Sequence, residues 1–336
     1  MEAIKAKNRI SVLGDGGWGT TLAIHLHNKG YDVTLWGVFD DYVASLKKKR
    51  VNTRFLPGIE IPRGLNITSD LREAGEGKDL IVLAIPSQYM RGVLRKAKPH
   101  IDRRNSVLVS VTKGIENKTL MRMSQVISDE LGTVKLGVLS GPTIAHELAK
   151  GMPTTAVAAC GNPDICRYLQ GIFISDRFRI YANDDVVGVE LGGSLKNVIA
   201  IGCGISDGLG FGSNAKAALL SRGLVEISRL GVALGAKTRT FSGISGLGDL
   251  VTTCISAYSR NRYIGEQIGR GKKLKQVVKH MQMIAEGVPT ARSAYELAKR
   301  HKVEMPIVRE VYSVLYKNKN ALKAVEDLMT RKMKVE

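Results

Sequence analysis

Three charged side chains stand in apolar or glycine-rich stretches of the sequence, where charge is uncommon. Lys113 follows the run VSVT, Lys196 lies within LKNVIAI, and Asp249 follows the glycine-rich turn GISGLG. Burial lowers the pKa of a lysine, and so does a second cation nearby. Two ammonium groups and a carboxylate around one carbonyl can therefore perform acid–base chemistry: a lysine gives a proton to the oxygen, or removes it in the reverse direction.

Each of these three residues also has a simpler interpretation. Lys113 could be solvated, Asp249 could be a helix N-cap, and Lys196 could extend its amine to the surface. The sequence leaves these alternatives open.

A second unusual pattern is SRNRYIGEQIG, residues 259–269. Ser259 is a suitable N-cap, yet Arg260 and Arg262 fall in the first helical turn, where cations oppose the helix dipole. A phosphate bound by arginine and free N–H groups would remove that conflict. The alternative is that both arginines turn to solvent. A phosphate here and a carbonyl near Lys196 would describe a small phosphorylated ketone or alcohol.

The segment ISVLGDGGWGTTLAIHLHNKG predicts a dinucleotide site, because it reads as strand, glycine turn and helix. Gly14, Gly16 and Gly19 fit the G-x-G-x-x-G spacing, in which the glycines permit a tight turn, approach of the pyrophosphate and close helix–strand packing. Gly17 lies in the same loop. The helix N-terminus then offers N–H groups to the phosphates.

The end of the second strand, WGVFDD, bears on which dinucleotide binds. No basic residue follows Gly37 and Phe39 for a 2′-phosphate, and Asp40 and Asp41 would repel one, so NAD(H) is favoured and NADP(H) stays an alternative. Phe39 either lies against the adenine or packs below the loop. In the next central strand, Pro86 ends the ladder and is expected at the carboxyl edge of the sheet, where ligands bind.

The elements that would position these residues change in character along the chain. Short β-branched runs alternate with helical segments in the first half, and long helical segments follow. We predict an α/β protein with an N-terminal Rossmann-type doubly wound parallel sheet, residues 1–187, and an all-α C-terminal domain, residues 188–336. The predicted strands cover 9–14, 32–37, 80–85, 106–111, 135–141, 154–160 and 178–184. The predicted helices of the second domain cover 188–202, 214–234, 248–256, 260–269, 289–301, 306–318 and 320–333.

Composition narrows the class of protein. The net charge is +19, which raises nucleic-acid binding as a possibility, but no aromatic residues are interleaved with the basic clusters for base stacking. The four cysteines form no C-x-x-C pair and are expected to be reduced, buried thiols, with no structural metal. No apolar run reaches the length of a membrane span and no signal peptide is evident, so a cytoplasmic protein without a membrane span is expected.

Several motifs together resemble the NAD(P)-dependent glycerol-3-phosphate dehydrogenases of bacteria and plastids. The motifs GDGGWGT, IPS, TKGIE, SGPTIAHELAKGMPT, VELGGSLKNVIAIGCGISDGLGFGSNAKAAL, GLGDLVTTC, SRNR and AEGVPT occur in order over nearly the whole chain. The resemblance implies reversible reduction of dihydroxyacetone phosphate to sn-glycerol 3-phosphate for glycerophospholipid synthesis. It also implies that the amine of Lys196 faces the nicotinamide across a cleft.

The resemblance assigns roles to particular residues. Lys196 is the proton donor or acceptor, and Lys113 and Asp249 line the substrate site. Further substrate-binding positions are Gly141, Thr143, Asn197, Thr253, Ser259, Arg260 and Asn261. Cofactor-binding positions are Trp18, Gly37, Lys113, Ala145, Arg260, Ile284 and Glu286. A homodimer is expected, because dimers are common among such folds.

Two other classes of protein remain as alternatives. Dehydrogenases of the 3-hydroxyacid or 6-phosphogluconate type also pair a Rossmann domain with a helical domain, but their motif has Asn four residues after the lysine, where this chain has Ala200. A basic nucleic-acid-binding protein would be revealed by a salt-dependent gel shift.

Overall fold

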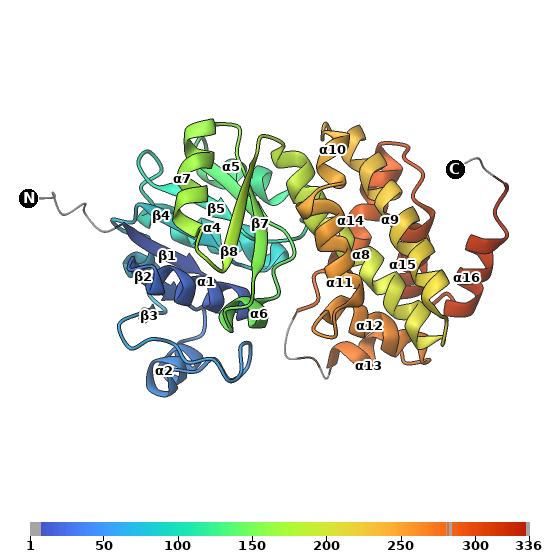
Figure 1. Cartoon of the computed structure of the whole chain (residues 1–336), viewed down its shortest axis with the longest axis horizontal. Helices are drawn as coiled ribbons and strands as arrows, with labels where there is room; N and C mark the ends of the chain where they lie inside the picture. The colour runs from blue at the N-terminus through green and yellow to red at the C-terminus, as the bar shows by residue number, and fades with distance from the viewer. Residues whose placement is uncertain (1–7, 280, 282–283, 334–336) are drawn as a thin grey trace, which may run out of the picture. The chain divides into compact units, whose positions relative to one another are not determined.

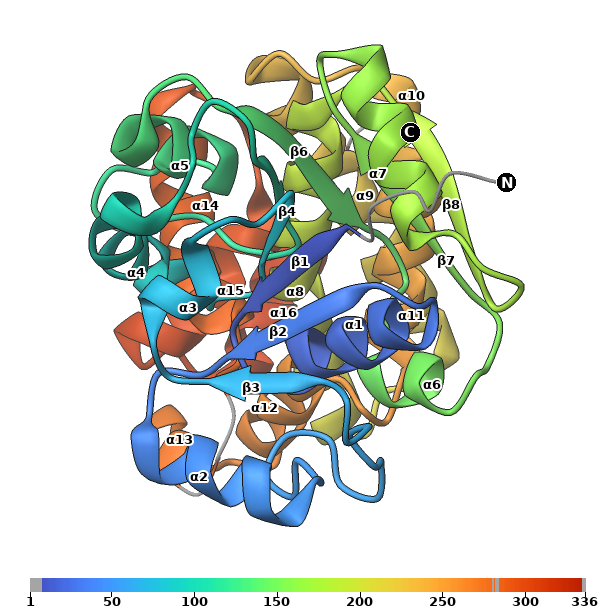
Figure 2. The same ribbon diagram turned by 90° about the vertical axis from the view of Figure 1, so that its left-hand side faces the viewer.

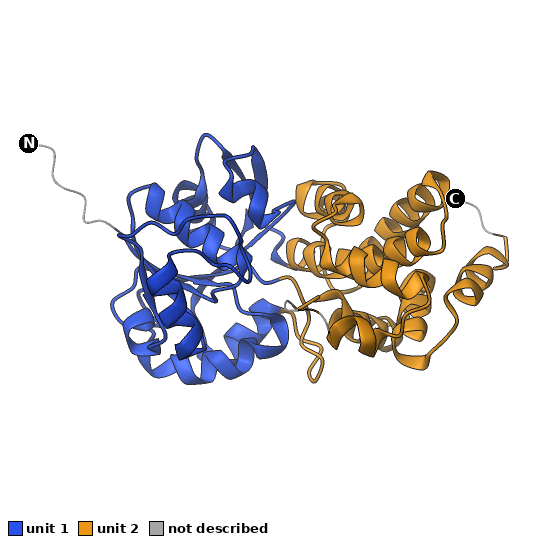
Figure 3. Cartoon of the chain, turned by 90° about the horizontal axis from the view of Figure 1, so that it is seen from below, with its two compact units in different colours: residues 1–112, 123–186 blue, residues 113–122, 187–336 orange. Residues whose placement is uncertain are grey.

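The chain divides into two compact units, which a computed structural model describes for residues 8–279, 281 and 284–333. Unit 1 comprises residues 1–112 and 123–186, and unit 2 comprises residues 113–122 and 187–336 (Figure 3). The short segment 113–122 therefore interrupts unit 1 in the sequence but packs with the helices of unit 2.

Unit 1 is built on one eight-stranded sheet with the strand order β3-β2-β1-β4-β5-β6-β7-β8. Neighbouring strands are parallel except for β6 and β7, which are antiparallel. Central strands such as Leu80–Leu83 are buried throughout, as expected of strands covered on both faces. The strands are β1 Arg9–Leu13, β2 Asp32–Trp36, β3 Asn66–Thr68, β4 Leu80–Leu83, β5 Val107–Ser110, β6 Lys135–Ser140, β7 Thr154–Ala159 and β8 Phe178–Asn183.

Helices cover both faces of this sheet. Figure 2 shows α3, α4 and α5 on one side and α1, α6 and α7 on the other. Helix α1 contacts α7 and the edge strand β8. His25 Nε2 lies 2.8 Å from the carbonyl oxygen of Phe173 in α7, and the Trp18 ring meets the Phe178 ring of β8 edge to face. The helices are α1 Gly17–Asn28, α2 Asp40–Lys49, α3 Leu71–Gly75, α4 Met90–Ala97, α5 Met123–Leu131, α6 Ala145–Ala149 and α7 Pro163–Phe173.

Unit 2 is helical and is arranged around α8, Val186–Gly208 (Figure 1). Leucine, isoleucine and valine side chains of α8 form one core with residues of the helices that follow it, among them Leu230, Leu250, Ile264 and Val311. The other helices are α9 Ser213–Ala233, α10 Thr238–Phe241, a π-helical turn Ile244–Gly248, α11 Asp249–Ile255, α12 Arg260–Gly269, α13 Leu274–Lys279, α14 Gly287–Arg300, α15 Pro306–Lys317 and α16 Ala321–Met329.

Helix α8 corrects one expectation from the sequence, that no segment is long and apolar enough to cross a membrane. Its 23 residues have a mean hydropathy of 1.4 in the most apolar 18-residue window, which meets that criterion. However, 89% of the window is buried inside the protein, and the helix carries the charged residues Glu190 and Lys196. Helix α8 is therefore the core helix of unit 2, and its hydrophobicity reflects burial on all sides.

Residue types at the helix ends explain where several helices begin or end. Gly30 follows α1 with φ +93°, as a C′ glycine does. Pro306 occupies the first turn of α15, and Asn320 caps α16 by accepting a hydrogen bond from the Lys323 amide. All four cysteines are free and buried.

Candidate active site

A buried cluster of charged groups in unit 2 joins the three residues that the sequence singled out. The carboxylate of Asp249, at the first residue of α11, accepts a hydrogen bond from Lys113 Nζ at 2.8 Å through Oδ2 and another from Lys196 Nζ through Oδ1. Lys196 Nζ also donates to Thr253 Oγ1 at 2.6 Å, and the Thr253 hydroxyl donates to the Asp249 carbonyl at 2.7 Å. These contacts leave the Lys196 amine in one defined position.

Burial and charge change the acidity of this lysine. Desolvation by burial is the largest influence on the pKa of Lys196 and lowers it; Asp249 acts in the opposite direction, and the nearby charge of Lys113 also lowers it, so that the resulting pKa is about 7. The side chain of Lys196 is 6% exposed, that of Asp249 2%, and that of Lys113 19%. A lysine with such a pKa can hold or release a proton near neutral pH.

The simpler interpretations of these residues are wrong. Lys196 does not extend to the surface, and Lys113 is half-buried against a carboxylate rather than fully solvated. Asp249 does not cap α11, because the N-cap position is Gly248 and no side chain accepts a hydrogen bond there.

The segment 113–122 is held in unit 2 by several side chains of α8 and α14. Ser194 Oγ donates to the Gly114 carbonyl at 3.3 Å, and Ser293 Oγ to the Ile115 carbonyl at 3.2 Å. Arg122 pairs with the buried carboxylate of Glu190. Sequence reasoning missed this ion pair, although Glu190 stands in the same apolar stretch as Lys196 and could have been noticed for the same reason.

A chain of amide groups lies beside the cluster. Asn197 donates to the Lys113 carbonyl at 3.4 Å and accepts from Asn261 Nδ2 at 2.9 Å, and Asn261 accepts from the Gly287 amide at 2.9 Å. Both asparagines are buried. The chain links segment 113–122, α8, α12 and α14, so the structure brings Asn197 and Asn261 together with Lys113.

The start of α12 agrees in part with the sequence prediction. Ser259 is the N-cap and accepts a hydrogen bond from the Arg262 amide at 3.2 Å. Arg262 does not turn freely to solvent, because its Nε lies 2.7 Å from an Asp207 oxygen. Arg260 is exposed and donates through Nη1 to the Ile284 carbonyl at 2.6 Å. Glu286 lies two residues further on and is half-buried.

In unit 1, the glycine loop adopts the shape that a dinucleotide site needs. Gly14 has φ +123°, and a Cβ atom there would lie 2.4 Å from the Ala84 carbonyl oxygen. A Cβ at Gly19 would lie 1.9 Å from the Gly14 carbonyl oxygen, whereas one at Gly16 would meet no atom within 4 Å. The loop is therefore closed towards the sheet and open where a ligand would approach α1, which has no acidic residue in its first turn.

Other predicted cofactor positions lie around this loop. A Cβ at Gly17 would lie 2.5 Å from the Phe55 carbonyl oxygen, and Thr21 donates to the Ala145 carbonyl at 3.1 Å. Gly37 and Pro86 follow β2 and β4, the two neighbours of β1, so both lie at the carboxyl edge of the sheet. Phe39 is 62% exposed, so the interpretation that it packs below the loop is wrong.

The remaining predicted positions differ in their environments. The Trp18 ring is half-buried against Phe178. Gly141 has φ +145°, and Thr143 Oγ1 donates to its carbonyl at 3.1 Å. Ile284 is 41% exposed in unit 2.

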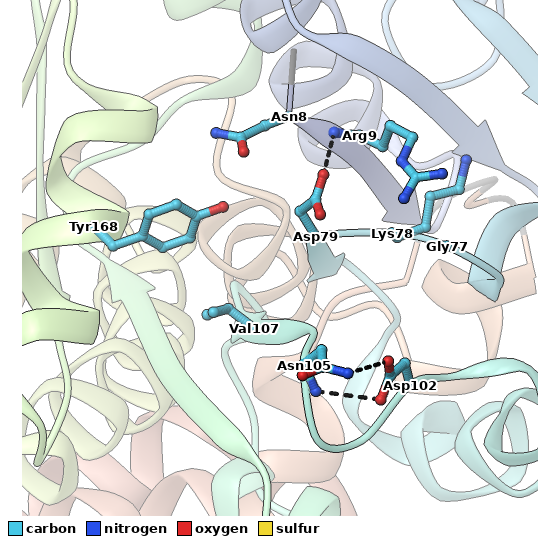
Figure 4. A pocket seen from close by; sticks show the side chains of 9 residues that line it. All are labelled: Asn8, Arg9, Gly77, Lys78, Asp79, Asp102, Asn105, Val107 and Tyr168. Carbon is cyan, nitrogen blue, oxygen red and sulfur yellow. Dashed lines mark hydrogen bonds between the residues drawn. The ribbon is translucent and has the colours of Figure 1, made fainter. Parts of the chain in front are cut away.

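A hollow of about 410 Å³ lies in unit 1 at the amino ends of the strands, opposite the carboxyl edge where the glycine loop lies. Figure 4 shows its lining, with Tyr168 of α7 on one side and Arg9, Lys78 and Asp79 near the amino ends of β1 and β4 on the other. Burial raises the pKa of Tyr168 to about 12. Ligands of open α/β sheets bind at the carboxyl ends of the strands, and no predicted site residue lines this hollow.

Comparison with known proteins identifies the family of this chain. The sequence profile described as NAD-dependent glycerol-3-phosphate dehydrogenase N-terminus matches residues 9–166, and the C-terminus profile of the same family matches residues 185–326. The protein named glycerol-3-phosphate dehydrogenase [NAD(P)+] from Geobacter sulfurreducens is 52% identical to this chain, and the alignment covers 98% of each chain. The protein of the same name from Syntrophotalea carbinolica is 50% identical, and the alignment covers 97% of this chain and 99% of that one.

A crystal structure shows the same likeness in three dimensions. Glycerol-3-phosphate dehydrogenase from Coxiella burnetii has a TM-score of 0.94 and 39% sequence identity, covering 97% of this chain and 99% of that one. With half of its residues identical to full-length relatives and both family profiles matched in order, this chain belongs to the NAD-dependent glycerol-3-phosphate dehydrogenase family.

Proposed function

We propose that this protein catalyses the reversible reduction of dihydroxyacetone phosphate to sn-glycerol 3-phosphate with a reduced nicotinamide dinucleotide, and so supplies glycerophospholipid synthesis. One observation carries the chemistry: Lys196, with a pKa of about 7, is held by Asp249 and Thr253 inside unit 2. The full-length relatives named glycerol-3-phosphate dehydrogenase [NAD(P)+] support the same reaction.

In this proposal Lys196 moves the proton. Its ammonium form donates to the substrate oxygen during reduction, and its neutral form accepts the proton back during oxidation. Asp249 holds the amine in place and compensates its charge, while Lys113 adds a second positive charge that lowers the pKa of Lys196. Burial of Lys196 and Asp249 strengthens these interactions, because little water screens them.

The substrate phosphate is assigned to the start of α12. Arg260 is exposed there and uses one guanidinium N–H for the Ile284 carbonyl, which leaves others for an anion. Ser259 and Asn261 flank it, although the Asn261 side chain already bonds Asn197 and Gly287. Asn197, Thr253, Gly141 and Thr143 complete the proposed substrate contacts, by analogy with the family.

The cofactor is assigned to the glycine loop, where the open space beside Gly16 fits a pyrophosphate at the N-terminus of α1. When bound, the dinucleotide supplies the hydride. Gly14, Gly16, Gly17 and Gly19 allow its close approach, and Gly37, Phe39, Pro86, Trp18 and Ala145 surround the loop. Lys113, Arg260, Ile284 and Glu286 of unit 2 are further proposed contacts. We propose residues 1–187 as the NAD-binding domain and residues 188–336 as the substrate-binding and catalytic domain.

The direct test measures oxidation of NADH by its loss of near-ultraviolet absorbance, with dihydroxyacetone phosphate as substrate and NADPH in parallel. Dihydroxyacetone without the phosphate is the matched control. We expect turnover only with the phosphorylated ketone, and faster turnover with NADH than with NADPH. Absence of turnover with both dinucleotides would contradict the proposal.

We also propose a cytoplasmic homodimer. Free, buried cysteines suit a reducing compartment, and burial of α8 within unit 2 suits a protein that does not span a membrane. A mainly apolar hollow of about 440 Å³ on α9, lined by Val225, Val232 and Ala233 among others, is a candidate contact surface. Light scattering on the purified protein tests the dimer, and a mass of one chain would contradict it.

A further inference from the structure

Asp15, in the glycine loop of unit 1, is a buried acid whose carboxylate is only partly satisfied. The residue is 9% exposed, and its Oδ2 has no hydrogen-bond partner among the residues that the structure describes. Burial raises its pKa to about 6. A buried carboxylate oxygen without a donor is costly, so it calls for an explanation outside the protein's own contacts.

The position of this carboxylate is informative. A Cβ atom built on Gly37 would lie 2.4 Å from Asp15 Oδ2 and 2.8 Å from Val43 Cγ2. Gly37 directly follows β2, and its amide donates to the Thr68 carbonyl at 3.0 Å. The Asp15 carboxylate therefore occupies the space where a side chain at the tip of β2 would begin.

The carboxyl end of this second strand has a known role in dinucleotide-binding sheets. NAD-binding proteins of this type place an acid there to receive the ribose hydroxyls of the adenosine half. In this chain the tip reads Gly37-Val38-Phe39, so the strand itself provides no acid.

We propose that Asp15, reaching over from the glycine loop, replaces the missing acid of β2: its carboxylate accepts hydrogen bonds from the adenosine ribose hydroxyls and disfavours a 2′-phosphate. This inference rests on the proposed use of a nicotinamide dinucleotide. It also assigns the discrimination to Asp15 rather than to Asp40 and Asp41, which are exposed in the first turn of α2.

The neighbouring cation sharpens the inference. Arg54 is the cation whose charge acts on Asp15, and its guanidinium lies over the Tyr42 ring, 4.6 Å from the centroid. Arg54 forms no ion pair with the described residues. If the charge of Asp15 were removed, the positive charge of Arg54 would remain and could pair with a 2′-phosphate.

The test is the binding of NADH and NADPH to the full chain by titration calorimetry at pH 8. We expect Asp15→Asn to weaken NADH binding and to tighten NADPH binding, each by roughly tenfold, the usual range for one charge-assisted hydrogen bond. Asp40→Asn is the matched control and should leave the ratio of the two affinities unchanged. Adding Arg54→Ala to Asp15→Asn should remove the gain in NADPH binding.

The outcomes separate this inference from the proposed function. If wild-type protein binds neither dinucleotide, the proposed function fails. If it binds NADH but Asp15→Asn leaves the affinity ratio unchanged, or Asp40→Asn changes it as much, the inference about Asp15 is wrong.

A second readout needs no variant and no turnover. Carbon NMR of the Asp15 carboxyl should give a pKa near 6 in the free protein and a lower pKa when NADH is bound, because the ribose hydroxyls then stabilise the anion. An unchanged pKa at saturation would overturn the inference.

Thermal unfolding of the free protein adds a check on the Asp15→Asn fold. The folded-state pKa lies above the ordinary value of 3.8, so the wild type loses stability as pH rises through about 6. Asp15→Asn should therefore be the more stable protein at pH 8 and lose this advantage below about pH 4. The opposite order at pH 8 would contradict the burial of an unsatisfied charge.

Discussion

The glycine loop of unit 1 and the lysine–aspartate cluster of unit 2 are built in opposite ways. The loop is six consecutive residues, 14–19, and its backbone conformation forms the site. The atoms that a Cβ would meet at Gly14, Gly17 and Gly19 are mainly backbone carbonyl oxygens. The cluster joins side chains 136 and 53 positions apart, Lys113 and Lys196 with Asp249. A site made of local backbone can be recognised as a motif, whereas a site made of distant side chains exists only when the whole unit is folded.

Removing the amine of the cluster should have the largest effect. We expect Lys196→Ala to lower turnover by about a hundredfold or more, in the range for a general acid–base group. The glycine loop lies in the other unit, so NADH affinity should change little. Steady-state kinetics and calorimetry check both parts, and near-normal turnover would remove Lys196 from its role.

Neutralising the carboxylate should change the pH dependence. Asp249 keeps the pKa of Lys196 from falling further, so Asp249→Asn should move it below 7. Reduction needs protonated Lys196 and should slow as pH rises through about 7, whereas oxidation should quicken over the same range. We expect the pH profiles of both reduction and oxidation to shift to lower pH in Asp249→Asn. Turnover at pH 7 should also fall by roughly tenfold or more. Unshifted profiles would show that Lys196 is not the titrating group.

Two glycines of the loop should separate fold from binding. Gly14→Ala places a Cβ 2.4 Å from the Ala84 carbonyl at a φ of +123°, so it should cost about 1–3 kcal/mol in the free energy of unfolding. Gly16→Ala meets no protein atom within 4 Å, so it should keep normal stability but weaken NADH binding by roughly tenfold. Equal stability losses in the two variants would contradict the described loop shape.

The start of α12 offers a test of the phosphate assignment. Arg260→Ala should raise the KM for dihydroxyacetone phosphate by about tenfold with a smaller change in turnover, because one charge-assisted contact is lost. Arg262→Ala is the matched control, since Arg262 is engaged with Asp207. An unchanged KM in Arg260→Ala would contradict the assignment.

The smallest expected effect concerns how segment 113–122 is held. Glu190→Gln removes the charge that pairs with Arg122, so Lys113 should be less firmly placed and turnover should fall by about threefold, with the pH limbs displaced. Glu266→Gln, which breaks the more exposed pair with Arg270, is the control. A loss of stability in Glu190→Gln without any change in the pH profile would make the pair purely structural.

Prediction from the sequence succeeded where a short pattern determines the structure. The glycine turn and seven strands follow from local sequence, and each strand lies within a residue or two of its predicted range. Strand β3 was missed, because the three residues NIT are too few to show a pattern. The antiparallel pairing of β7 was also missed, since side-chain alternation does not report strand direction.

In unit 2 one predicted helix end was wrong because of close packing between helices. Helix α8 was predicted to stop at 202 because of its glycines, yet it continues to 208. A Cβ at Gly204 would lie 2.0 Å from the Arg262 carbonyl oxygen, so this glycine serves close contact with α12 rather than a turn. The grouping of segment 113–122 with unit 2 had no signal in the sequence, because it depends on contacts with α8 and α14. The sequence was enough to single out Lys113, Lys196 and Asp249, but it could not show which of them form ion pairs.

The burial of α8 has a consequence for how the chain is made. On the ribosome this 23-residue apolar helix emerges before α9, α12 and α15, the helices that cover it. Until they are synthesised, the nascent polypeptide exposes a segment with the hydrophobicity of a membrane anchor. The order of the helices therefore leaves α8 in need of protection during synthesis, and a chain cut short before α15 keeps an uncovered, aggregation-prone surface.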